Sequence, residues 1–153
     1  MQKLLKIDDK DIKILRELVS DASQSVPHLS KKLNMDPSVV YSRIKRMIKL
    51  GYIEGYTVQV NDEMLGWDVL AIIGINAESK KRDNVYEALY RMPEIRQVNE
   101  VTGRYDFLAF LKAKTIEDLH TLITDKVGVI DGVNYTETFI SLRSKIKSFE
   151  LLA

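Results

Sequence analysis

The chain has 153 residues, of which 45% are hydrophobic, and it has no cysteine, which excludes disulfides, thiol nucleophiles and cysteine-based metal sites. Its formal net charge is only +1, but residues 1–60 hold 11 Lys/Arg against 7 Asp/Glu, a net +4, and residues 61–153 hold 12 against 15, a net −3. A basic first part and an acidic second part indicate two functions, the first of them on a polyanion.

The N-terminal stretch MQKLLKIDDKD is charged and lacks the apolar core of a signal peptide. The longest apolar run, Val69 to Ile75, is far too short to span a bilayer. We therefore expect a soluble cytoplasmic protein, associated with the nucleoid through its basic part, with no membrane partner.

A first helix is predicted near the N-terminus. Asp8 or Asp9 can cap it, and it extends to about Ser20. Its apolar stripe is predicted from helical spacing. The stripe consists of Ile12, Leu15 and Val19, widened by Ile14 and Leu18.

Two further short helices, joined by a tight turn, are predicted between Ser25 and Leu50. Ser25 can cap the first of them, with Pro27 in its first turn, where a missing N–H costs little. Residues 34–36 form the turn, and Asp36 caps the next helix, which a proline opens and Gly51 ends. The residues predicted to face inward are Leu29 and Leu33 on the first helix and Val40, Ile44 and Met47 on the second.

Residues 52–60 have strand character interrupted by Gly55, which fits either a wing or a connector. The polar stretch 61–66 is the best domain boundary. We therefore expect a DNA-binding domain over residues 1–60, a linker over 61–66 and a second domain over 67–153.

Strands and helices alternate in the second domain. Strands are predicted at 67–77, 95–102, 105–113 and 133–142, and a further strand is considered at 145–152. Helices are predicted at 83–92 and 115–126, the second of them capped by Thr115. The order βαββαβ is typical of the ferredoxin-like split βαβ fold. The expected fold class is therefore α+β, with an N-terminal helix-turn-helix, a winged helix-turn-helix if residues 52–60 form a wing, and a C-terminal ferredoxin-like domain.

Two of these strands are apolar on both faces and need cover on both sides. The two helices can cover only one face, so a second copy of the chain is the simplest cover for the other. The alternative is cover by the C-terminal strand and the linker. In the first strand, one face holds Val69, Ala71, Ile73 and Ile75, and the other holds Leu70 and Ile72. In the third strand, one face holds Phe107, Ala109 and Leu111, and the other holds Leu108 and Phe110.

The helix at 37–50 carries four cations and no acid, with small polar residues near its N-terminus. A helix of this kind fits the major groove of double-stranded DNA, although cations on a helix face are also common where nothing binds. Arg43 is expected to reach a guanine edge or a phosphate, and Val39 a thymine methyl. The hydroxyls expected to donate to bases or phosphates are those of Ser38, Tyr41 and Ser42, and the cations expected on phosphates are Lys45, Arg46 and Lys49.

Three segments together resemble the Lrp/AsnC family, the feast/famine transcription regulators. They are IDDKDIKILRELVSDA, LSKKLNMDPSVVYSRIKRMIKLGYI and VTGRYDFLAFL, whose Gly-x-Tyr-Asp sequence is similar to a turn in the family's C-terminal domain. The resemblance implies dimers paired through the second domain, often assembled into octamers. It also implies an amino acid or related metabolite as effector, bound where C-terminal domains of neighbouring dimers meet.

Gly103 lies between two predicted strands, where a turn often requires a positive φ. Backbone N–H groups near it can donate to a carboxylate, and Asp106 can accept from an ammonium group. Thr136 and Thr138 share one face of the last long strand, where they either offer hydroxyls to a ligand or simply face solvent. The resemblance adds Tyr105 and, more weakly, Asn99, Glu100, Val101 and Thr102.

No phosphate-binding loop or metal-ligand spacing occurs in the sequence, so no cofactor, metal or catalytic activity is expected. The function that the resemblance implies is a sequence-specific transcription regulator that responds to an amino acid. The alternative is an architectural DNA-binding protein of the same fold without an effector.

Overall fold

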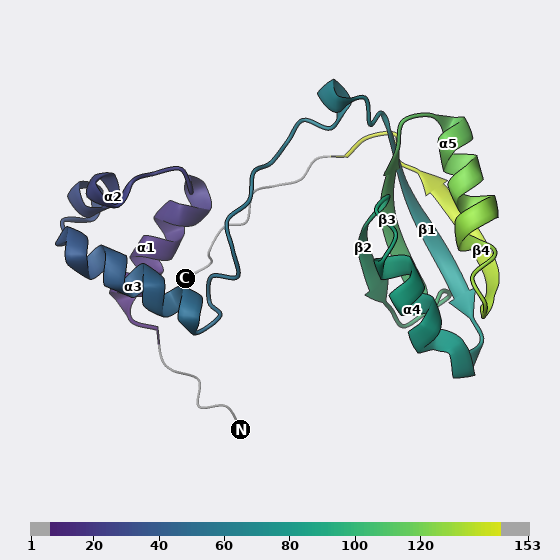
Figure 1. Cartoon of the computed structure of the whole chain (residues 1–153), viewed down its shortest axis with the longest axis horizontal. Coiled ribbons are helices and arrows are strands. Elements are labelled where there is room, and N and C mark those ends of the chain that lie inside the picture. The colour runs from purple at the N-terminus through teal and green to yellow at the C-terminus, as the bar shows by residue number, and fades with distance from the viewer. Residues whose placement is uncertain (1–6, 145–153) are drawn as a thin grey trace. The chain divides into compact units, whose positions relative to one another are not determined.

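The computed structural model describes residues 7–144, which divide between Gln59 and Val60 into two units (Figure 1). The further strand considered at 145–152 lies outside the described residues. Among the described residues, no helix is long and apolar enough to cross a membrane.

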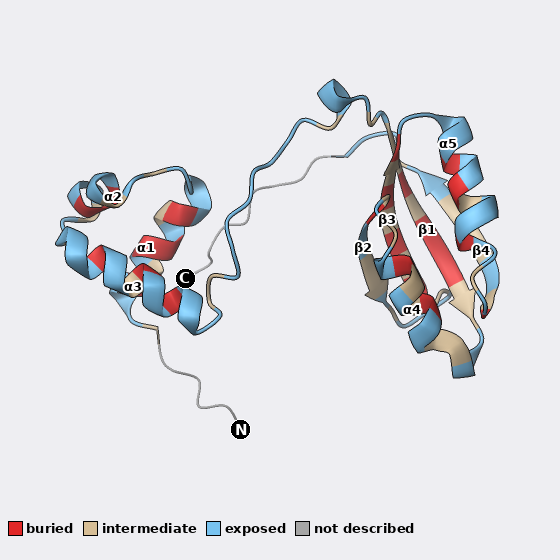
Figure 2. Ribbon diagram, in the orientation of Figure 1, coloured by how far each residue is buried: buried red, intermediate tan, exposed pale blue. Residues whose placement is uncertain are grey.

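The first unit consists of three helices: α1 (Asp9–Ser20), α2 (Val26–Leu33) and α3 (Pro37–Lys49). The predicted caps are confirmed, with Asp8, Ser25 and Asp36 each accepting a hydrogen bond from the first turn of its helix. The core of this unit is made of Ile14, Leu15 and Leu18 of α1, Leu29 of α2, and Val40, Ile44 and Met47 of α3 (Figure 2).

The apolar stripe of α1 is centred differently from the prediction. Ile14, Leu15 and Leu18 are buried, whereas Ile12 is half-buried and Val19 is 39% exposed. The stripe predicted from helical spacing was broad and included Ile12 and Val19, which lie at its edges. The packing of α2 and α3 against α1 selects which part of that stripe is buried.

The turn between α2 and α3 passes through Asn34, which adopts a left-handed conformation with φ 50°. Asparagine tolerates this region better than other non-glycine residues, and a β-branched residue does not. We expect Asn34→Gly to leave the stability of this unit unchanged and Asn34→Val to lower it by about 1–2 kcal/mol. Chemical denaturation followed by helical circular dichroism checks this, and equal midpoints for the two variants would contradict it.

Residues 54–61 contain no β-strand, so this stretch is a connector in the structure. A single 3₁₀ turn, η1 (Glu63–Leu65), lies in the predicted linker, and the first strand begins at Val69 rather than Trp67.

The second unit contains β1 (Val69–Ala77), a short turn η2 (Ser79–Lys81), α4 (Arg82–Tyr90), β2 (Ile95–Glu100), β3 (Phe107–Ala113), α5 (Ile116–Thr121), η3 (Leu122–Val127) and β4 (Val133–Ile140). The strands form one antiparallel sheet in the order β2-β3-β1-β4. The βαββαβ order is therefore confirmed. Helix α5 is capped by Thr115, as predicted, but it continues into η3 as a π-helix.

One face of this sheet is buried beneath the helices. In β3 every second residue is buried, because successive strand residues point to opposite faces, and β1 follows the same alternation at Ala71, Ile73 and Ile75. Gly74 of β1 is also buried, because the Tyr105 ring covers it on the opposite face. Helices α4 and α5 lie against that face (Figures 1 and 2). The residues buried there include Ala71, Ile73 and Ile75 of β1, Phe107, Ala109 and Leu111 of β3, Val85 and Leu89 of α4, and Leu119 of α5.

The opposite face of the sheet, here called the open face, is also apolar. Leu70 and Ile72 of β1 and Leu108 and Phe110 of β3 are half-buried there. Phe139 of β4, which pairs with Ile72, is 44% exposed. A run of large apolar side chains across three strands is a typical site of protein association.

Candidate nucleic-acid interface and ligand site

Six of the eight predicted DNA-contacting side chains lie exposed on the outer face of α3, and none of the six forms an ion pair with a described residue. Neither Lys45 nor Lys49 forms an ion pair with any described residue. Tyr41 is half exposed, and the Lys45 ammonium lies 4.7 Å from the centre of its ring. The six exposed residues, here called the outer set, are Ser38, Val39, Tyr41, Ser42, Lys45 and Lys49.

The serine hydroxyls of the outer set already donate hydrogen bonds. Ser38 Oγ donates to Asp36 Oδ1 at 2.6 Å, and Ser42 Oγ donates to the Val39 carbonyl at 3.0 Å. The first bond is the main reason why the pKa of Asp36 is lowered. In this arrangement each hydroxyl oxygen can still accept a hydrogen bond. The two serines therefore suit the amino groups of bases, which donate, better than the phosphates and base acceptors to which the sequence led us to expect them to donate.

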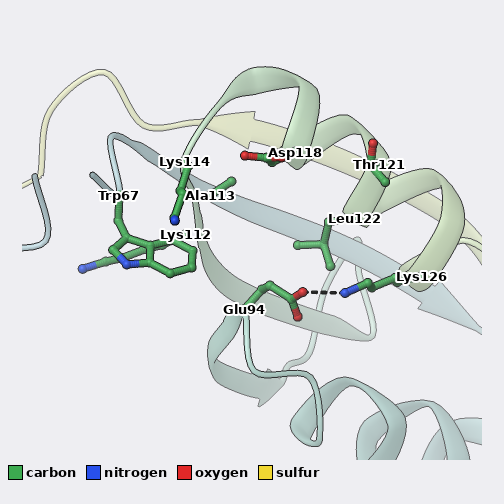
Figure 3. Close-up of a pocket in the computed structure, with 9 residues that line it drawn as sticks. All are labelled: Trp67, Glu94, Lys112, Ala113, Lys114, Asp118, Thr121, Leu122 and Lys126. Atoms are coloured by element: carbon green, nitrogen blue, oxygen red, sulfur yellow. Dashed lines mark hydrogen bonds and ion pairs between the residues drawn. The ribbon is translucent and has the colours of Figure 1, made fainter. Parts of the chain in front are cut away.

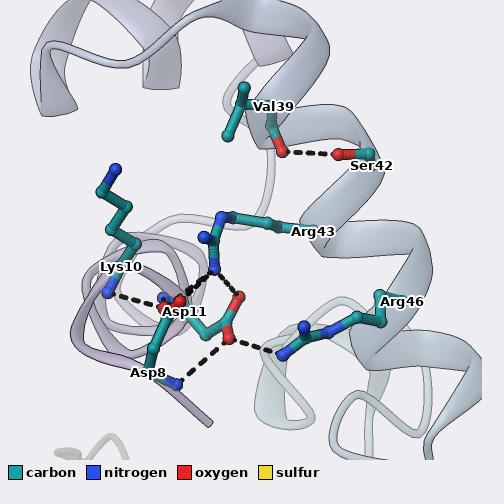
Figure 4. Close-up of polar contacts among 7 residues, drawn as sticks. All are labelled: Asp8, Lys10, Asp11, Val39, Ser42, Arg43 and Arg46. Carbon is teal, nitrogen blue, oxygen red and sulfur yellow. Dashed lines mark hydrogen bonds and ion pairs between the residues drawn. The ribbon is translucent and has the colours of Figure 1, made fainter.

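Arg43 and Arg46 do not belong to the outer set, because both reach the N-terminal end of α1 (Figure 4). Arg43 Nη1 lies 2.8 Å from both carboxylate oxygens of Asp8 and 2.9 Å from Asp11 Oδ1. Arg46 Nη2 lies 2.9 Å from Asp11 Oδ2. The structure therefore engages Nη1 of Arg43 and Nη2 of Arg46 within the unit, and a contact of either guanidinium with a guanine edge or a phosphate stays a prediction.

Asp8, Asp11, Arg43 and Arg46 are here called the Asp11 cluster. At its centre is the carboxylate of Asp11, which is fully buried. Asp8 and Asp11 also cap α1 reciprocally, each accepting from the other's backbone N–H. That backbone bond from Asp11, followed by the side-chain bond from Arg43, lowers the pKa of Asp8 to about 2. The Asp8 cap therefore contributes stability above about pH 4 and loses it as the pH falls toward 2.

Sequence reasoning identified the cap at Asp8 but missed the role of Asp11. A local signal existed, because acidic side chains three residues apart at a helix start are typical of a capping box. The pairing with Arg43 spans more than thirty residues of chain, so no local pattern indicates it.

In the second unit, Gly103 adopts a φ of +136°, which confirms the expected need for glycine in the turn between β2 and β3. Within the described residues, the backbone N–H groups of residues 102–105 have no hydrogen-bond acceptor. Successive free N–H groups of this kind can bind an anion such as a carboxylate.

Both carboxylate oxygens of Asp106 already have a partner within the unit, which the sequence did not indicate. Its Oδ2 accepts from the Ala77 N–H at 2.9 Å, and its Oδ1 lies 3.0 Å from Arg82 Nη1. The other amino group of Arg82 pairs with Glu100 at 2.9 Å. Both carboxylates therefore anchor this loop to the start of α4, a role that spacing in the sequence cannot reveal.

We expect Asp106→Ala to lower the stability of the second unit by about 1–3 kcal/mol, because hydrogen bonds to charged groups typically contribute that much. Trp67, the only tryptophan, lies in this unit, so its fluorescence during denaturation gives the measurement. Asp83→Ala, which changes an exposed acid of α4, is the matched control. If Asp106→Ala unfolds at the wild-type midpoint, the anchoring role is wrong.

The remaining predicted ligand residues do not all come together within one chain. The Tyr105 ring lies over Gly74 on the open face, and its hydroxyl bonds to Glu137. Thr136 and Thr138 pair with buried residues of β1, so they point to the helix-covered face. The sheet therefore separates Tyr105 from the two threonines. Asn99 lies on the open face of β2, while Val101 and Thr102 lead into the Gly103 turn.

Among the described residues, no group of three or more His, Asp or Glu side chains is placed to hold a metal ion. The arrangement found is a helix-turn-helix with an exposed cationic face, together with a sheet domain that presents unpaired N–H groups at a turn. A DNA-binding unit joined to a ligand-binding unit defines the class of transcriptional regulators.

Comparison with known proteins supports this class. Residues 7–54 match the family model for a winged helix-turn-helix DNA-binding domain, and residues 70–151 match that for the Lrp/AsnC ligand binding domain. An uncharacterised HTH-type transcriptional regulator of Pyrococcus furiosus is 37% identical over 96% of this chain and 99% of its own.

Two solved structures have the same fold. AsnC of E. coli has a TM-score of 0.86 at 29% identity, covering 93% of this chain and 96% of that one. The Neisseria meningitidis transcriptional regulator NMB0573, solved as a complex with L-Met, has a TM-score of 0.90 at 20% identity, covering 96% and 97%. The chain belongs to the Lrp/AsnC family of transcription regulators.

Proposed function

We propose that this regulator binds specific DNA sequences through the outer set of α3, and that an amino acid bound at the Gly103 turn modulates its DNA binding or assembly. The observation that carries the DNA proposal is the outer set itself, in which two lysines that form no ion pair with a described residue lie beside small side chains. The lysines supply sequence-independent phosphate contacts, and Ser38, Val39 and Ser42 supply contacts to base edges.

The ligand proposal is supported by the free N–H groups of residues 102–105, which suit a carboxylate. It is also supported by the L-Met complex of the Neisseria regulator, which shares the fold. Each carboxylate oxygen of Asp106 already has one partner, so a further acceptor would strengthen the binding of the ligand's ammonium group. A second copy of the chain is the simplest source, which places the ligand between subunits.

The open face supports a homodimer. Burying its large apolar side chains against the same face of a second copy would give both sheets their missing cover. Dimers could then assemble further, up to an octamer. Mass determination in solution with and without DNA tests the assembly, and a monomer at all concentrations would contradict it.

The decisive experiment measures the affinity for a selected operator with and without each of the twenty amino acids, and the affinity for the active amino acid with and without operator. Linkage requires the two ratios to be equal. Reciprocal coupling supports the proposal. Tight DNA binding that no amino acid alters would instead favour an architectural DNA-binding protein. The variant Gly103→Val locates the site, because it should abolish the coupling without changing basal DNA binding.

A further inference from the structure

A small cavity of about 230 Å³ lies in the second unit, beneath α5 and beside the end of β3 (Figure 3). Its wall combines the indole of Trp67 and the side chain of Leu122 with five charged side chains, which are those of Glu94, Lys112, Lys114, Asp118 and Lys126. The cavity is smaller than the roughly 300–1,000 Å³ of sites for drug-sized molecules, so it suits a ligand of only a few heavy atoms.

Three charged side chains at this cavity have unmet pairing capacity. Asp118 is exposed and forms no ion pair with any described residue. Glu94 Oε1 accepts from Lys126 at 2.5 Å, but Glu94 Oε2 is buried and has no hydrogen-bond partner among the described residues. Lys114 forms no ion pair with any described residue, and its ammonium lies 5.6 Å from the centre of the Trp67 ring. A buried carboxylate oxygen without a donor is costly, and such groups often mark a binding site.

We propose that this cavity binds a small zwitterion of the amino acid class, with its ammonium group on Glu94 Oε2, its carboxylate on Lys114 and its apolar side chain against Trp67 and Leu122. The opposite charges of the two protein groups select a ligand that carries both an ammonium and a carboxylate. A simple anion would leave Glu94 unpaired, and a simple amine would leave Lys114 unpaired.

The ionisation of Glu94 fits this role. The hydrogen bond from Lys126 lowers the pKa of Glu94, so its carboxylate is charged at neutral pH. Lys126 thereby holds the carboxylate in place while leaving its second oxygen free for a ligand donor.

This site is separate from the Gly103 turn and does not depend on the proposed function. Strand β3 begins near that turn, at Phe107, and ends beside the cavity, at Ala113. At roughly 3.3 Å per residue, the strand places the two about 20 Å apart.

The test uses the full chain, with Trp67 fluorescence as the reporter, since it is the only tryptophan and lines the cavity. The probes are glycine, alanine, valine, leucine, isoleucine and methionine. Acetate, which has only the carboxylate, and ethylamine, which has only the ammonium group, serve as the half-ligands. We expect a saturable change with at least one amino acid and none with the half-ligands. Lys114→Ala should weaken binding by about tenfold, the usual effect of losing a charge-assisted contact.

Lys80→Ala, an exposed lysine outside the cavity, is the matched control and should bind as the wild type does. Glu94→Gln keeps the shape of the side chain and should also weaken binding. A fluorescence response that persists in Lys114→Ala but disappears in Gly103→Val would assign the ligand to the Gly103 turn and overturn this proposal. So would the absence of any saturable response. Neither result would contradict amino acid control of DNA binding.

Discussion

Asp11→Ala is expected to destabilise the helix-turn-helix unit by about 3–5 kcal/mol, the typical effect of removing one partner from a buried ion pair. Asp11 is fully buried and is the partner that Arg43 and Arg46 share. Its loss leaves two cations at the contact between α1 and α3 with only Asp8 to pair them. A unit of about fifty residues rarely has more stability than this to lose.

Two probes separate the units in this experiment. The helical circular dichroism signal reports mainly on unfolding of the first unit, which is built of helices. Trp67 fluorescence reports on unfolding of the second unit. Asp9→Ala, which changes an exposed acid on the same turn of α1, is the matched control and should stay within about 0.5 kcal/mol of wild type. If Asp11→Ala unfolds like Asp9→Ala, the Asp11 cluster does not hold the unit together.

Gly74→Ala is expected to cost about 1–3 kcal/mol, the usual range for overpacking a core. A Cβ added at Gly74 would lie 2.7–2.8 Å from the nearest ring carbons of Tyr105, far inside van der Waals contact. Tyr105 would therefore have to leave its position against Phe139 and Glu137. Because Tyr105 follows the Gly103 turn directly, ligand binding at that turn should weaken as well.

Gly55→Ala is the control, since an added Cβ there meets no atom within 4 Å and the backbone does not require glycine. Thermal unfolding followed by Trp67 fluorescence reports the difference. Equal midpoints for Gly74→Ala and wild type would show that Tyr105 is not seated on Gly74.

Features that depend on neighbouring residues were predictable from the sequence. The caps at Ser25, Asp36 and Thr115 are confirmed because each bonds within its own first turn. The alternation along β1 and β3 is confirmed because a strand turns successive side chains to opposite faces.

Features that depend on distant contacts were not predictable. The engagement of Arg43 by Asp8 and Asp11 depends on where α1 packs against α3, which cations on a helix face do not indicate. The engagement of Asp106 by Arg82 depends on the turn bringing β3 to the start of α4. In both cases a charged side chain expected to bind a ligand instead has a partner within its own unit.

The measurement that tests the central claim most directly is the DNA affinity of the full-length protein across a salt series. The wild type is compared with the double variant Lys45→Ala/Lys49→Ala, with Lys80→Ala in the other unit as control. If these two lysines of the outer set bind phosphates, the slope of log affinity against log salt should decrease in magnitude by about 2 in the double variant alone. An unchanged slope, with both units still folded, would contradict the claim that the outer face of α3 is the DNA-binding surface.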